Sequence, residues 1–257
     1  MVWRAWGQGE ALVMLHGGHG SWNHWIRNID ALSRHRTVWA PDMPGFGDSD
    51  KAVGCKDADT IWRPVADALA AVVGPGADLM GFSFGAMVSG YVAANRPELV
   101  RRLILVGAPA FGLRTEPVPG LVSVRGISES AGIASAHRAN LMAIMLHSPD
   151  ALDELALYMQ TLNVPRDRLP TRRLSRTHVM LEMSPRWACP VMGIWGREDA
   201  LYQGGVIAQL RATLAACDLR AFHLVDDVGH WVQYERAHMF NELLLGFLED
   251  ASTLASR

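Results

Sequence analysis

The feature that most constrains the fold is the alternation of short, predominantly apolar runs with stretches of helical character. Apolar runs occupy residues 11–15, 37–40, 78–82, 102–107, 190–196 and 221–225, and Gly, Pro or Asp residues flank most of them. Such strands are typical of a parallel sheet that is covered on both faces, because neither face meets water. Helical patterns lie between the runs, for example over 61–73 and 86–95. The sequence therefore predicts an α/β fold with a mostly parallel sheet of about seven or eight strands flanked by helices.

The pattern changes after a proline-rich stretch at 109–119. From about residue 113 to 186 the chain is helical, apolar and rich in Leu and Met, and it contains no strand-like run. The strand pattern then returns, and the chain closes with an amphipathic helix over 238–251. We expect residues 1–112 and 187–257 to form the core domain, and residues 113–186 to form a helical lid inserted into it.

The composition excludes several classes of function. Lys and Arg number 24 and Asp and Glu 26, so the net charge is −2, and no long basic run indicates a nucleic-acid surface. No apolar run reaches the ~18–20 residues that span a bilayer, and the N-terminus lacks the order of a secretory signal. Cys55, Cys189 and Cys217 lie far apart, which predicts neither a zinc site nor disulfides. We expect a cytoplasmic protein that acts on a small molecule, without a nucleic-acid or membrane partner. Its oligomeric state stays open, with a homodimer as one option.

A candidate nucleophile lies in Gly81-Phe82-Ser83-Phe84-Gly85, which matches G-x-S-x-G. The motif follows an apolar strand and opens a helix, which is the context that it requires. Glycines two residues on either side of the serine remove the side chains that would clash in so sharp a turn. The turn is expected to place the Ser83 hydroxyl at the carboxyl edge of the sheet, where open α/β sheets bind ligands.

A neutral serine needs a base, and the base needs an orienting acid. His230 follows the last predicted strand, and the ordinary pKa of histidine, about 6.5, suits a base at neutral pH. Asp199 follows the strand at 190–196 and is the predicted acid. The order Ser83, Asp199, His230 is that of α/β-hydrolases and differs from the orders of chymotrypsin and subtilisin. Other candidates for the acid are Glu198, Asp226 and Asp227, the last two as residues of a turn before His230.

An acyl-transfer site also needs two backbone N–H groups for the oxyanion. The predicted donors are the N–H of Phe84, which follows the serine, and that of Gly18 in the loop His16-Gly17-Gly18-His19-Gly20. The loop lacks the lysine and the glycine spacing of a phosphate-binding loop. A metal site at His16, His19 and His24 is disfavoured, because no carboxylate or thiol lies close by in the sequence.

These segments resemble the α/β-hydrolase superfamily over nearly the whole chain. The matching segments are His16-Gly17-Gly18, residues 41–49 (PDMPGFGDS), the serine motif, residues 196–199 (GRED) and Gly229-His230-Trp231. The resemblance implies a hydrolase with Ser83, Asp199 and His230 as its triad, a helical lid over the site, and neither cofactor nor metal. A serine at this position differs from the aspartate of the epoxide and haloalkane branches, whereas the same triad also serves cofactor-free perhydrolysis.

Residues 229–235 (GHWVQYE) with Phe240-Asn241 resemble the meta-cleavage-product hydrolases, which cut carbon–carbon bonds in ring-fission products of aromatic compounds. That resemblance implies a lid arginine that binds the carboxylate of the substrate. The candidates are Arg166, Arg168, Arg172, Arg173 and Arg176. Those enzymes usually carry Asn-Ser-Met where this chain has Phe82-Ser83-Phe84.

We therefore expect a serine hydrolase that cleaves a small, partly apolar ester through an acyl-enzyme. Carbon–carbon hydrolysis of the meta-cleavage type is the alternative, and a non-catalytic ligand-binding protein is a third reading, since fold alone does not decide function. Methionines and tryptophans are expected to supply an apolar pocket wall, although methionines in a helical lid also serve as core packing. The predicted wall consists of Trp22, Trp25, Met142, Met145, Met159 and Trp231.

Overall fold

The computed structural model of the chain describes residues 1–113 and 118–250. Within them the sheet has seven strands in the order β1-β3-β2-β4-β5-β6-β7. Only β1 is antiparallel to its neighbour, and the other neighbouring strands run parallel. The strands are β1 (Ala5–Trp6), β2 (Ala11–Leu15), β3 (Thr37–Trp39), β4 (Ala77–Phe82), β5 (Val100–Val106), β6 (Val191–Gly196) and β7 (Leu219–Val225). The predicted α/β class and the mostly parallel sheet are thus confirmed.

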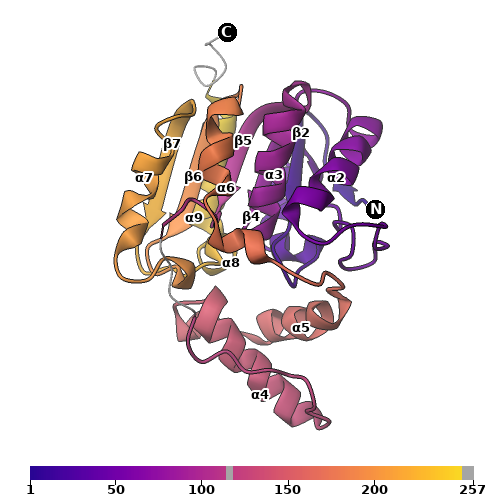
Figure 1. Cartoon of the computed structure of the whole chain (residues 1–257), viewed down its shortest axis with the longest axis vertical. Coiled ribbons are helices and arrows are strands. Elements are labelled where there is room, and N and C mark those ends of the chain that lie inside the picture. The colour runs from indigo at the N-terminus through magenta and orange to yellow at the C-terminus, as the bar shows by residue number, and fades with distance from the viewer. Residues whose placement is uncertain (114–117, 251–257) are drawn as a thin grey trace.

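Helices cover both faces of the sheet (Figure 1). Their bounds are α1 (Ile29–Ser33), α2 (Ala58–Val72), α3 (Phe84–Asn95), α4 (Ser130–Asn140), α5 (Glu154–Asn163), α6 (Val179–Met183), α7 (Leu210–Thr213), α8 (Val232–Glu235) and α9 (Ala237–Glu249). Buried residues of α2, α3 and α7 belong to one hydrophobic cluster, and those of α1 and α9 belong to the other. The closing helix predicted over 238–251 corresponds to α9.

The strands show why the sequence forms a sheet with two buried faces. In β2, Val13 and Leu15 pack into the cluster of α2 and α3, whereas Leu12 and Met14 pack into the cluster of α1 and α9. Successive side chains of a strand point to opposite faces, so a strand that is buried on both faces must be apolar at every position. The uninterrupted apolar runs of the sequence follow from this arrangement.

The segment between β5 and β6 folds as helices, among them α4, α5 and α6, and no strand occurs in its described part. Helices α4 and α5 lie below the edge at which the parallel strands end (Figure 1). A buried polar cluster ties α5 to the loop after β2, because Asn163 hydrogen-bonds Ser21 at 3.0 Å and Asn23 at 2.8 Å. None of the helices in the described ranges has the length and apolar character that crossing a membrane requires.

Candidate active site

Ser83 occupies the turn between β4 and α3 in a strained backbone conformation, with φ 52° and ψ −114°. A Cβ atom on Gly81 would lie 2.4 Å from the carbonyl oxygen of Gly85, and one on Gly85 would lie 2.3 Å from that of Leu15. Both contacts are with backbone, which cannot yield as a side chain can. The spacing of the motif thus has a steric cause, and a non-glycine residue at positive φ is a strain that concentrates at functional sites.

His230 and Asp199 meet although 31 residues separate them in the sequence. The Nδ1 atom of His230 lies 2.7 Å from Oδ2 of Asp199, and both side chains are buried. The other carboxylate oxygen of Asp199 accepts the N–H of Leu201 at 2.9 Å, which fixes the orientation of the carboxylate. The structure thus brings together the predicted base and the predicted acid. A proton on Nδ1 leaves Nε2 of His230 free to accept one from a nucleophile.

The other candidate acids are directed elsewhere. Asp226 pairs with Arg197 at the surface, and Asp227 has a φ of 57° in the turn before His230. Glu198 is exposed. The position of Asp199 directly after β6 therefore distinguishes it from its neighbours.

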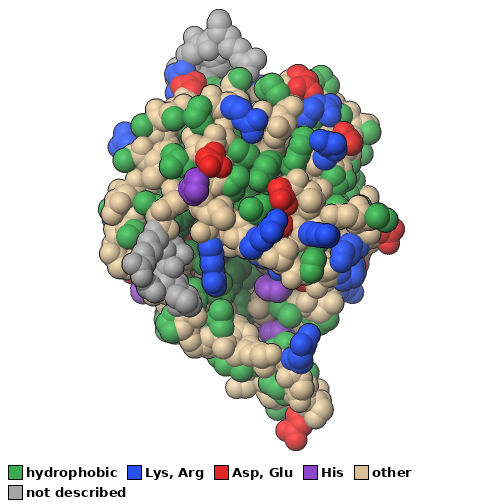
Figure 2. Space-filling model, in the orientation of Figure 1, with side chains coloured by type: hydrophobic (Ala, Val, Ile, Leu, Met, Phe, Trp, Pro, Cys, Tyr) green, Lys and Arg blue, Asp and Glu red, His purple; other side chains and the backbone are tan. Residues whose placement is uncertain are grey.

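Ser83 and His230 line one cavity of about 200 Å³ between the sheet and the helical segment that joins β5 to β6, which is called the lid below. Its lining residues are Gly18, His19, Ser83, Phe84, Pro109, Ile144, Met145, Gln160, Arg172, Ser175, Leu201 and His230. Figure 2 shows the surface hollowed above the lid helices, with hydrophobic side chains inside and basic and histidine side chains on the rim. The cavity is thus a mostly apolar cleft with a few polar groups, as is typical of small-molecule sites.

Two buried histidines fix the loop that carries the predicted oxyanion donor Gly18. The N–H of Met43 donates to Nε2 of His16 at 3.0 Å, so the ring proton of His16 is on Nδ1 and is donated to the carbonyl oxygen of Gly17 at 2.8 Å. On the other side of that residue, the N–H of Gly17 donates to Nδ1 of His24 at 3.3 Å. Burial lowers the pKa of His16, and it lowers the pKa of His24 well below its ordinary value. Both rings are therefore neutral near pH 7, as these hydrogen bonds require.

The bond from His16 also determines where the N–H of Gly18 points. In a trans peptide the C=O of one residue and the N–H of the next point in opposite directions, and the described chain contains no cis peptide. Because the carbonyl of Gly17 points to His16, the N–H of Gly18 points away from it. Within the described part of the chain no hydrogen bond engages the N–H of Gly18 or of Phe84, and both residues line the cavity. Phe84 is also the first residue of α3, where the helix dipole favours negative charge.

Among the five candidate lid arginines, Arg172 is the one that lines this cavity. A Cβ atom on Gly18 would lie 2.7 Å from its Nε, so the guanidinium covers the predicted oxyanion loop. One end of the guanidinium pairs with Asp167, whereas the buried Nε has no hydrogen-bond partner in the described residues. The other four lie elsewhere: Arg166 pairs with Asp48, Arg168 donates to the carbonyl of Ser49, Arg173 pairs with Asp59 and Arg176 lines a neighbouring cavity.

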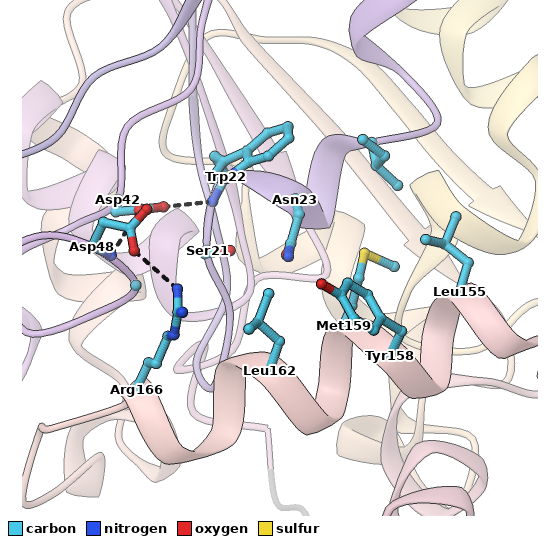
Figure 3. Close-up of a pocket in the computed structure, with 12 residues that line it drawn as sticks. Ser21, Trp22, Asn23, Asp42, Asp48, Leu155, Tyr158, Met159, Leu162 and Arg166 are labelled. Carbon is cyan, nitrogen blue, oxygen red and sulfur yellow. Dashed lines mark hydrogen bonds and ion pairs between the residues drawn. The ribbon is translucent and has the colours of Figure 1, made fainter.

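Of the six residues predicted to form an apolar wall, Met145 lines the cavity of Ser83 and His230. Trp22 and Met159 instead line a second cavity between α5 and the core, beside the ion pair of Asp48 with Arg166 (Figure 3). Trp25 is fully buried among core side chains, and Met142 packs against the same cluster. Trp231 is buried and stacks on Tyr234, with the ring centroids 4.2 Å apart. These five residues do not line the cavity that contains the serine.

Six further residues line the cavity that were not predicted as site residues from the sequence. The apolar ones are Pro109, Ile144 and Leu201, and the polar ones are His19, Gln160 and Ser175. Leu201 could have been inferred from its place two residues after Asp199. Ile144 and Gln160 could not, because the lid sequence contains many apolar and polar residues that are equivalent in pattern.

Comparisons with known proteins agree with the fold. Residues 10–129 match the family model of the alpha/beta hydrolase fold. The 2-hydroxymuconate semialdehyde hydrolase of Pseudomonas sp. (strain CF600) is 30% identical over 97% of this chain and 90% of its own length. The 2-hydroxy-6-oxononadienedioate/2-hydroxy-6-oxononatrienedioate hydrolase of Pseudomonas sp is 27% identical over 93% of this chain and 88% of its own.

Among solved structures, the meta-cleavage product hydrolase CumD from Pseudomonas fluorescens IP01 superposes with a TM-score of 0.75 at 24% identity. The match covers 97% of this chain and 94% of that one, and at this identity it supports the fold alone. The relative at 30% identity, matched over nearly the full length of both chains, decides the family. The chain therefore belongs to the α/β-hydrolase superfamily, and it is a hydrolase.

Proposed function

We propose that this hydrolase cleaves a carbon–carbon bond in 2-hydroxy-6-oxo-2,4-dienoates, the ring-fission products of aromatic compounds. The observation that carries the proposal is Arg172, which lines the cavity of Ser83 and His230 and whose Nε has no hydrogen-bond partner among the described residues. A partly buried guanidinium with a free donor is suited to a carboxylate, and a neutral ester has no group that needs it. The names of the relatives at 27–30% identity point to the same chemistry.

The residues of the cavity can be assigned to the steps of this reaction. Arg172 binds the C1 carboxylate and places the C6 ketone at Ser83. The dienol first becomes a ketone at C2, so that the electron pair of the C5–C6 bond can delocalise when the bond breaks. Ser83 then attacks C6 while His230 takes its proton, and Asp199 stabilises the imidazolium. The N–H groups of Gly18 and Phe84 stabilise the oxyanion. The C5–C6 bond breaks, its electron pair delocalises onto the C2 ketone, and the leaving carbon takes the proton that His230 holds. Water then attacks the acyl group, loses a proton to His230 and releases the acyl group from Ser83 as a carboxylic acid, while that proton returns to the serine oxygen.

Stopped-flow absorbance with 2-hydroxy-6-oxohepta-2,4-dienoate tests the proposal, because its dienol chromophore bleaches on cleavage. We expect rapid bleaching and release of acetate by the wild-type protein. Ser83→Ala should release no acetate, and its dienol absorbance should decay only through ketonisation. Arg172→Gln should raise KM for the dienoate by about tenfold or more, since a charge-assisted hydrogen bond contributes about 1.5–3 kcal/mol. The same variant should change the hydrolysis of neutral p-nitrophenyl acetate little. Equal effects of Arg172→Gln on both substrates would contradict the assignment of the carboxylate to Arg172.

Ester hydrolysis is the second candidate function. Phe84 lies next to the serine, where the meta-cleavage-product hydrolases usually carry methionine. Its ring is buried, and the centroids of the Phe84 and Phe46 rings are 5.8 Å apart. Triad, oxyanion donors and an apolar slot are all that an ester requires. A kcat/KM on p-nitrophenyl butyrate that far exceeds the value on the dienoate would favour this reading.

A further inference from the structure

A second histidine–carboxylate pair, His19 with Asp167, lies at the rim of the same cavity. The Nδ1 atom of His19 lies 2.7 Å from Oδ2 of Asp167, which is the same ring nitrogen and the same separation as in the pair of His230 with Asp199. The side chain of Asp167 is 2% exposed, whereas that of His19 is 56% exposed. Cleavage by Ser83, His230 and Asp199 alone leaves this second pair without a role.

Asp167 fixes both the backbone and the ring of His19. Its Oδ2 also accepts the backbone N–H of His19 at 3.1 Å. His19 has a φ of 51°, a conformation that non-glycine residues adopt rarely and that persists where the surroundings impose it. Burial alone would raise the pKa of Asp167, but its bonds with His19 and the charge of Arg172 hold that pKa below its ordinary value. Asp167 is thus ionised and favours the proton on Nδ1, which leaves Nε2 of His19 as an acceptor.

Arg172 determines which part of the substrate His19 meets. The guanidinium of Arg172 and the ring of His19 pair with the same oxygen of Asp167. A carboxylate bound to Arg172 therefore lies beside His19, and in a 2-hydroxydienoate the carbon next to the carboxylate carries the hydroxyl group. His230 lies at the other end of the reaction, beside Ser83 and hence beside C5 and C6 of the substrate. Within the described ranges no hydrogen bond engages Nε2 of His19.

We propose that His19 is a second catalytic base, oriented by Asp167, that removes the proton of the C2 hydroxyl group and so starts ketonisation. The proposal rests on the carbon–carbon hydrolysis proposed above. The proton of the hydroxyl moves to Nε2 of His19, and the electron pair of the O–H bond moves through the diene to C5. C5 takes a proton from water, so that His230 stays neutral and ready to activate Ser83. His19 then returns its proton to solvent, to which its exposed ring has access.

The Ser83→Ala background isolates this step, because ketonisation proceeds there without cleavage. We expect the dienol absorbance of 2-hydroxy-6-oxohepta-2,4-dienoate to decay in Ser83→Ala and to decay about 100-fold more slowly in Ser83→Ala with His19→Asn. Asparagine suits this position because it tolerates positive φ. Asp167→Asn should slow the same decay severalfold. His238→Asn is the matched control, because the ring of His238 is fully at the surface of α9.

A second readout separates catalysis from loop structure. In the single variant His19→Asn, the loss of kcat on the dienoate should exceed the loss on p-nitrophenyl acetate by at least about tenfold, since an ester needs no ketonisation. Equal losses on both substrates would show that His19 only shapes the loop of Gly18, and unchanged decay of the dienol would show that it is not the base. If the wild-type protein does not bleach the dienoate, both the carbon–carbon function and the His19 step are wrong. If the wild-type protein bleaches it and His19→Asn bleaches it at the same rate, only the His19 step is wrong.

Discussion

At the scale of single residues, the contact of Asp199 with His230 makes the sharpest prediction. Replacing Asp199 with asparagine puts an amide opposite Nδ1 of His230, which fixes the wrong tautomer and cannot stabilise the imidazolium. We expect Asp199→Asn to lower kcat by about four orders of magnitude. The melting temperature should change little, because asparagine has the same shape. Steady-state kinetics with p-nitrophenyl acetate and a thermal melt measure both quantities.

Asp226→Asn is the matched control, since Asp226 lies in the approach to the same histidine but is 72% exposed and pairs with Arg197. Exposed ion pairs contribute about 0–1 kcal/mol, so kcat should stay within about twofold. A large loss of kcat in Asp226→Asn, together with near-normal kcat in Asp199→Asn, would show that Asp226 rather than Asp199 orients His230.

The buried histidines predict how stability depends on pH. Burial lowers the pKa of His24 well below its ordinary value, whereas in the unfolded chain that pKa returns to about 6.5. Below that pH the unfolded state binds a proton that the folded state does not, so the free energy of unfolding falls as the pH falls. One such group contributes at most about 1.4 kcal/mol per pH unit.

Urea unfolding of the wild-type protein and of His24→Asn at pH 7, 6 and 5 tests this. Asparagine keeps an acceptor for the N–H of Gly17 but does not titrate. The variant should be less stable at pH 7 and should lose less further stability between pH 7 and pH 5. The remaining loss includes that of His16, His137 and His223, whose pKa values burial also lowers. If both proteins lose the same free energy of unfolding between pH 7 and pH 5, groups other than His24 cause the acid sensitivity.

At the scale of elements, the positions of the three proposed catalytic residues were predictable from the sequence. Ser83 and Asp199 follow the buried strands β4 and β6, and His230 follows the partly buried edge strand β7. The carboxyl ends of parallel strands meet at one edge of a sheet. Strand identity in turn follows from burial on both faces, which leaves an uninterrupted apolar run in the sequence. The glycines of the serine turn are likewise local requirements. Features of short sequence segments therefore determine where these three residues lie.

The contribution of the lid could not be predicted in this way. Arg172 differs from the other four arginines of its segment only through contacts with Asp167 and Gly18, and Gly18 is far away in the sequence. Trp22 and Met159 line a different cavity (Figure 3), whose lining residues do not include Ser83. Which face of a lid helix meets the site depends on tertiary packing, and helical periodicity does not encode it.

Glu235 of α8 joins the loop of His230 to the lid. Its carboxylate is buried and accepts three backbone N–H groups, from Gly229 at 2.7 Å, His147 at 3.0 Å and Ser148 at 2.9 Å. In Glu235→Gln the side-chain NH₂ must face at least one of these donors. We expect a loss of about 1–3 kcal/mol in the free energy of unfolding and a lower kcat, because the same bonds position His230 and the lid residue Met145.

Glu242→Gln on the exposed face of α9 is the control, since Glu242 contacts only His238 and solvent among the described residues. Urea unfolding and kcat measured on both variants decide the matter. Unchanged stability in Glu235→Gln would show that the three bonds contribute nothing net.

At the scale of the whole molecule, lid and core share one hydrophobic cluster. Leu141, Met145 and Met159 of the lid pack in the same cluster as the sheet residues Met80 and Ile194. The cavity of Ser83 lies across this junction, with Arg172 and Met145 on the lid side. A chain built in this way should unfold in one cooperative transition, and a ligand that fills the cavity should stabilise all of it.

Hexa-2,4-dienoate is a suitable ligand, because it has the diene and the carboxylate but no ketone for Ser83 to attack. At 100 times its Kd it should add about 2.7 kcal/mol to the free energy of unfolding, which corresponds to a rise in Tm of about 5–10 °C for a chain of this size. The alcohol hexa-2,4-dien-1-ol at the same concentration should raise Tm far less, and Arg172→Gln should remove the difference between the two ligands. Differential scanning calorimetry measures all four combinations. Two separate transitions, only one of which the dienoate shifts, would show that lid and core unfold independently. Equal rises in Tm with the acid and the alcohol would show that Arg172 does not bind the carboxylate.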